Sequence, residues 1–100
     1  MGNKFITLIE TIEKRPSLYI GKNSIFSLSA FLSGVAFDSA YSNDYSIIDN
    51  FQQWVEKKYR ITTSQSWASI LNFYSSDEKD ALKLFFLLFK EFILDTNEKS

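Results

Sequence analysis

The sequence predicts an all-α fold, a compact bundle of about five helices that uses residues 1–100 as a single domain. The first observation is the segment 81–94, ALKLFFLLFKEFIL, which holds four phenylalanines, five leucines and only three charged side chains. A segment this apolar is typical of the central helix of a bundle, and it is too short to span about 30 Å of hydrocarbon. The second is the aromatic share of 17%, dominated by ten Phe rings that need burial in a core. The third is the recurrence of apolar side chains at helical spacing along most of the chain.

The first predicted helix covers residues 4–14. Its apolar residues recur at helical spacing, opposite charged ones: Phe5, Leu8, Ile9 and Ile12. Pro16 ends this helix, because its ring disfavours α geometry in the residue before it. We expect 15–23 to be an ordered connection in which the apolar triplet 18–20 packs under the bundle.

Three further helices follow before the apolar segment. Ser24 is a good N-cap for the second helix, which carries no charge as far as Phe37. The third begins at residue 49 or 50, after a polar break, and extends to about residue 60. A short fourth helix covers residues from 65 or 66 to 74.

The fifth predicted helix contains the apolar segment and begins at a capping box formed by Ser75 and Glu78. The polar tail 95–100 is expected to fray. Three lysines mark the solvent side of this helix: Lys79, Lys83 and Lys90. Three apolar residues fall within the same arc: Phe86, Leu87 and Leu94. Either another segment of the chain, such as 18–20, or a partner protein must cover that face.

The sequence offers no reactive group for catalysis, so it does not predict an enzyme. It has no cysteine and no histidine, which removes the thiolate nucleophile, the commonest general base and the commonest metal ligand. Three glycines are too few to build a phosphate-binding loop around. The carboxylates of Asp77, Glu78 and Asp80 sit at a helix start, where acidic residues favour the helix dipole. We therefore expect no catalytic, cofactor-binding or metal-binding residues.

Charge and the N-terminal residues restrict the partners and the location. A net charge of −1 disfavours general attraction to nucleic acid or anionic lipid. The basic run 54–60 is interrupted by Glu56 and is better explained as solvated helix surface. The first apolar stretch contains charges and no signal-peptide core. We expect a cytoplasmic protein that binds neither nucleic acid nor a membrane.

Four segments in order, RPSLYIG, AFLSGVAFD, FQQWVEKKY and SQSWASILNFYSSDEKDALKLFFLLFKEF, resemble a set of small bacterial proteins of about this length. The pattern of that set is RPxxYIG, a helix with AFLxGY, a Trp-containing helix, a second Trp and a C-terminal helix similar to LFFELLEEF. Here Val35 stands in place of the tyrosine, and the last helix is less acidic. The first segment also resembles the opening of a DNA gyrase B-type ATPase domain, but no magnesium motif or glycine-rich lid follows it.

Several proteins of the first set are associated with toxin loci as immunity proteins of contact-dependent growth inhibition systems. The resemblance implies that this chain binds a cognate toxin, a nuclease domain, and occludes its active site without a cofactor. Carboxylates would then stand in for the phosphates of the nuclease's substrate. The residues that the sequence favours for this surface are Asp44, Tyr45, Asp49 and Glu56. The alternative is a non-catalytic helical adaptor or self-assembling protein, including a homodimer, with its contact at Phe86, Leu87 and Leu94.

Overall fold

The computed structural model describes residues 3–96, and in that range the chain is helical and contains no strand. The helices are α1 (Lys4–Lys14), α2 (Pro16–Ile20), α3 (Ile25–Val35), the short 3-10 helix η1 (Ser42–Asp44), α4 (Ser46–Lys58), α5 (Trp67–Phe73) and α6 (Glu78–Thr96). This confirms the all-α prediction. Five α-helices have seven or more residues, and the additional short one, α2, lies within the predicted connection.

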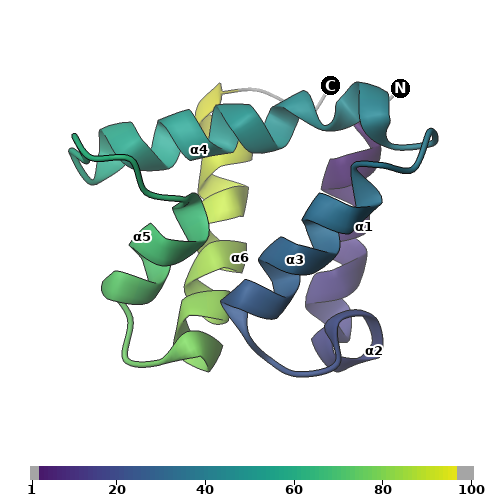
Figure 1. Ribbon diagram of the computed structural model, residues 1–100, viewed down its shortest axis with the longest axis horizontal. Helices are drawn as coiled ribbons and strands as arrows, with labels where there is room; N and C mark the ends of the chain where they lie inside the picture. Colours follow the sequence, from purple (N-terminus) through teal and green to yellow (C-terminus); the bar gives the residue numbers. More distant parts are fainter. Residues whose placement is uncertain (1–2, 97–100) are drawn as a thin grey trace.

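The helices form a bundle with α4 laid across one end (Figure 1). Below α4 in that view run α1, α3, α5 and α6, and α2 lies at the opposite end of the molecule. The longest helix, α6, packs mainly against α3 and α5 and also contacts α4. The predicted central position of the most apolar segment is therefore confirmed. No helix among residues 3–96 is long and apolar enough to cross a membrane.

The core is built around the ring of Phe51 on α4. Phe51 is fully buried, and its ring centroid lies 5.4–6.0 Å from the centroids of five other aromatic rings. These rings belong to α4 itself, to α5 and to α6: Trp54, Trp67, Phe85, Phe89 and Phe92. Most of these contacts are edge-to-face, the arrangement that aromatic quadrupoles prefer. The high Phe content is thus used to join three helices.

Helix starts follow the expected chemistry with one correction. Ser24 caps α3, as predicted, and its hydroxyl accepts hydrogen bonds from the backbone N–H groups of the helix's first turn. The predicted capping box at α6 is wrong. The hydroxyl of Ser75 donates to the Leu71 carbonyl at 2.8 Å, and Asp77 Oδ1 instead accepts the Asp80 N–H at 2.7 Å. Glu78 is turned toward α3, where its carboxylate accepts a hydrogen bond from the buried Ser24 hydroxyl.

Two other sequence expectations need correction. The triplet 18–20 does not pack under the bundle as a unit, because Leu18 is 69% exposed. The third predicted helix starts earlier than expected, at Ser46, and its first turn buries Ile47 and Ile48. In the predicted tail, residues 95 and 96 still belong to α6, and 97–100 lie outside the described residues.

Candidate functional site

The charges of the chain are unevenly distributed over the fold. Residues 23–56, which build α3, η1 and most of α4, contain no lysine or arginine. They do contain four carboxylates: Asp38, Asp44, Asp49 and Glu56. Three of the four residues that the sequence favoured for binding a toxin are therefore acidic residues in a region without basic ones.

Two of these four sequence-predicted residues serve the fold. Asp44 Oδ2 accepts the backbone N–H of Lys4 at 2.8 Å, and the Asp44 carbonyl accepts the Asn3 side-chain amide at 3.3 Å. A carboxylate at this position satisfies a free N–H of α1 and favours its dipole. Tyr45 is half-buried, and its ring packs edge-on against the Phe5 ring with centroids 5.4 Å apart. Both residues thus fix α1 to the start of α4.

Glu56 also has a structural contact. Its carboxylate accepts a hydrogen bond from the Gln52 side chain at 2.9 Å. Gln52 in turn donates to the Gln65 carbonyl at 2.8 Å and accepts the Trp67 N–H at 2.6 Å. This network fixes the loop before α5 against α4. Asp49 differs from the other three, because it is exposed and its side chain makes no hydrogen bond or ion pair with any described residue.

The structure adds an aromatic residue that the sequence reasoning missed. Phe37 lies just after α3, and 91% of its surface is exposed, the largest value among the large apolar side chains of residues 3–96. Asp38 follows it, with one carboxylate oxygen accepting the Ala40 N–H at 2.8 Å. We call three exposed residues that lie along the chain between the end of α3 and the first turn of α4, namely Phe37, Asp38 and Asp49, the α3–α4 corner. The sequence contains a signal for this surface, because Phe37 comes directly before Asp38, and Asp38 is the first carboxylate after the uncharged helix α3.

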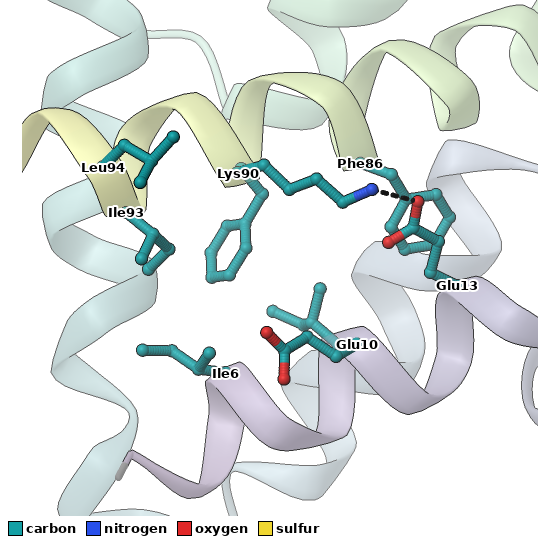
Figure 2. Close-up of a pocket in the computed structure, with 9 residues that line it drawn as sticks. Ile6, Glu10, Glu13, Phe86, Lys90, Ile93 and Leu94 are labelled. Atoms are coloured by element: carbon teal, nitrogen blue, oxygen red, sulfur yellow. Dashed lines mark hydrogen bonds and ion pairs between the residues drawn. The ribbon is translucent and has the colours of Figure 1, made fainter. Parts of the chain in front are cut away.

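A second candidate surface is a groove between α1 and α6 (Figure 2). It has a volume of about 270 Å³ and a mainly apolar lining that includes Ile6, Phe86 and Ile93. The Lys90 ammonium on α6 reaches the Glu13 carboxylate on α1 at 2.8 Å and so joins the two walls. The groove could receive an apolar side chain of a partner between charged rims.

This groove accounts for one of the three apolar residues in the lysine-bearing arc of α6. Phe86 is only 7% exposed, because it lies against α1 in the groove. Phe86 faces α1 across this groove and also lies beside Pro16 and Asn23 of the 15–23 connection, so it is not part of an exposed contact face. Leu87 and Leu94 remain available at 65% and 84% exposure. The predicted contact face is therefore corrected to these two residues.

One titratable group has a clearly displaced proton equilibrium. Burial raises the pKa of Tyr59, and the positive charge of Lys58 partly opposes that rise. The Tyr59 ring stacks on the Tyr74 ring, with centroids 4.6 Å apart. Within residues 3–96, no group of three or more His, Cys, Asp or Glu side chains is placed to hold a metal ion.

Comparison with known proteins gives no relative to guide the assignment. The chain matches no protein-family model, no curated protein sequence and no solved structure.

Proposed function

We propose that this chain is an immunity protein, which binds a cognate bacterial toxin with a nuclease domain and occludes the toxin's active site. Two observations support the proposal. One is the resemblance of the sequence segments to immunity proteins of contact-dependent growth inhibition systems. The other is the α3–α4 corner, where an exposed Phe37 directly precedes Asp38 in a stretch of sequence without basic residues, and where Asp49 is exposed on α4. The exposure of Phe37 in this acidic stretch is the observation on which the proposal rests.

The corner has the chemistry needed to bind a basic protein cleft. A nuclease must attract the phosphates of its substrate, so its active site is surrounded by positive charge. Asp38 and Asp49 would take the places of those phosphates and accelerate association. Phe37 would be the anchor, because large aromatic side chains supply much of the binding energy at interface centres. Inhibition of this kind needs a complementary surface and no catalytic group.

The first experiment is co-expression with the toxin encoded by the neighbouring gene. We expect the chain to restore growth and to co-purify with the toxin. Absence of both effects would reject the proposal. Active-site occlusion is tested separately with the purified pair, because nuclease activity must fall in parallel with formation of the complex.

The second experiment locates the surface. Phe37→Ala and Asp49→Lys should each raise the Kd for the toxin at least about tenfold, because each removes an interface anchor or reverses a steering charge. Phe73→Ala is the matched control, since Phe73 is also an exposed Phe, at 77%, and lies at the end of α5. Equal affinities for the Phe37 and Phe73 variants would exclude the α3–α4 corner as the contact.

The alternative function is a non-catalytic helical adaptor or self-assembling protein. Leu87 and Leu94 favour it, because two exposed leucines on one helix form an apolar contact of the kind that partner proteins cover. A chain that neutralises no toxin but associates through α6 would support this alternative over the immunity function.

A further inference from the structure

The outer face of α6 carries a row of five exposed residues at intervals of four. In order along the helix they are Lys79, Lys83, Leu87, Glu91 and Asp95. Residues at this interval form one continuous ridge on a helix surface. The ridge has two positive charges, a central leucine and two negative charges. Its charge pattern therefore changes sign about Leu87.

Along α6 itself, this order of charges is unfavourable. Lys79 lies in the first turn of α6 and Asp95 near its end, which is the reverse of what the helix dipole favours. Lys79 with Lys83, and Glu91 with Asp95, are like charges four residues apart, which repel each other. The two lysines form neither of the ion pairs found among residues 3–96.

We propose that α6 is the contact of a symmetric homodimer, in which the α6 helices of two copies pack antiparallel with Leu87 on the two-fold axis. This interface goes beyond toxin binding and does not depend on it. A two-fold contact brings the same surface of both copies together in opposite directions. The ridge is positive at one end and negative at the other. Two copies of it bring opposite charges together only when the two helices run antiparallel.

The positions along the helix agree with this geometry. Lys83 and Glu91 each lie four residues from Leu87, which is about 6 Å along the axis in opposite directions. Antiparallel pairing about Leu87 therefore places Lys83 of each copy beside Glu91 of the other. The same operation places Lys79 of each copy beside Asp95 of the other. The contact would cover Leu87, which is 65% exposed in the single chain.

The carboxylates of this ridge have the capacity for a second partner. Glu91 binds the Lys58 ammonium at 3.0 Å, and Asp95 accepts the Trp54 indole N–H at 2.8 Å. Each carboxylate has about four acceptor positions, and Glu91 keeps half of its side-chain surface exposed. A lysine of the second copy can therefore join these contacts without breaking them. Such a network would be more favourable than an isolated exposed ion pair.

The test is a charge exchange followed by analytical ultracentrifugation at about 10 µM to 1 mM protein. The wild-type chain should show a concentration-dependent monomer–dimer equilibrium. Lys83→Glu or Glu91→Lys alone should raise the dimer Kd at least about tenfold, because the twofold symmetry turns two attractive pairs into repulsive ones. Lys4→Glu, a reversal at the start of α1 beside Tyr19 and Tyr41, should leave the Kd unchanged.

Two combinations distinguish this interface from a general charge effect. The chain with both Lys83→Glu and Glu91→Lys should recover the homodimer. A mixture of the two single variants should form a one-to-one heterodimer, because every pair is then complementary. Circular dichroism confirms that each variant is folded. A monomeric wild-type chain over the whole concentration range, or single variants that do not associate when mixed, would overturn the proposal.

Discussion

The α3–α4 corner and the outer ridge of α6 both expose a large apolar side chain but differ in how charge surrounds it. Phe37 at the corner has only carboxylates as charged neighbours along the chain, from residue 23 to residue 56. Leu87 on the ridge has lysines on one side and carboxylates on the other. A surface of one sign repels its own copy across a two-fold axis, whereas an antisymmetric surface attracts it. The arrangement of charge, more than its total, thus indicates which partner each region fits.

Both regions also pair an exposed residue with a structural residue of similar type. On α6, Leu87 is exposed and its neighbour Phe86 is buried against α1. Near the start of α4, the Asp49 side chain is exposed and has no partner among the described residues, while Asp44 accepts the Lys4 N–H of α1. Substitutions should therefore separate the two members of each pair, with a loss of stability at the structural residue alone.

The largest difference is expected on α6. Phe86→Ala should lower the free energy of unfolding by about 3 kcal/mol, because it removes a buried ring and leaves a cavity beside α1. Leu87→Ala should change it by less than about 0.5 kcal/mol, as is usual for an exposed side chain. Urea unfolding followed by circular dichroism measures both values. Similar losses for the two variants would mean that Leu87 is covered within the single chain.

The protein concentration must be controlled in that measurement. If α6 forms the homodimer, Leu87→Ala will also lose the stabilisation that dimerisation gives at high concentration. Measurements at a concentration well below the dimer Kd isolate the effect on the monomer. A difference between Leu87→Ala and wild type that grows with concentration would support the ridge as an interface.

Sequence periodicity predicted that α6 is a strongly apolar helix. It did not predict which apolar residues of the lysine-bearing arc are buried and which are exposed. Phe86 and Leu87 are adjacent, so they point about 100° apart on the helix, and periodicity alone places both near the lysines. What separates them is α1, whose Ile6 and Glu13 come more than 70 residues earlier in the chain. Local pattern carries no information on which side of a helix such a distant segment covers.

The corner shows the same boundary between local and long-range information. The N-cap role of Ser24 could be predicted, because the capping serine and the helix are neighbours in sequence. The role of Asp44 could not, because the N–H that it accepts belongs to Lys4, 40 residues away. Tyr45 likewise packs on Phe5 of the same helix. The polar segment before α4 was therefore predicted to be a binding loop, although its residues Asp44 and Tyr45 hold α1 in place.

A smaller difference is expected between the two aspartates. Asp44→Ala should lower the free energy of unfolding by about 1 kcal/mol, because it removes the hydrogen-bond acceptor of the Lys4 N–H in the first turn of α1. Asp49→Ala should cost less than about 0.5 kcal/mol, and its effect should be on toxin binding. Thermal unfolding of the two variants in parallel gives the comparison. A stability loss at Asp49 equal to that at Asp44 would assign a structural role to both and weaken the corner as a free surface.

The smallest effect concerns the far end of α4, where Tyr59 follows Lys58, the partner of Glu91 on α6. Burial raises the pKa of Tyr59, whereas in the unfolded chain that pKa is about 10. The folded state therefore keeps its proton to higher pH than the unfolded state does. This contribution to stability is complete below about pH 10 and is lost as the pH rises through the raised pKa.

Tyr59→Phe should accordingly show a shallower decline of unfolding free energy between about pH 9 and 11 than wild type. Lys58→Met should act in the opposite direction, because the positive charge of Lys58 opposes the rise in the pKa of Tyr59. Its removal should steepen the decline of unfolding free energy with pH, because the pKa of Tyr59 in the folded chain then rises further. Urea unfolding at a series of pH values measures the slopes. Identical slopes for all three proteins would mean that Tyr59 titrates as it does in the unfolded chain, and that the α4 end is more open to water than its packing against Tyr74 indicates.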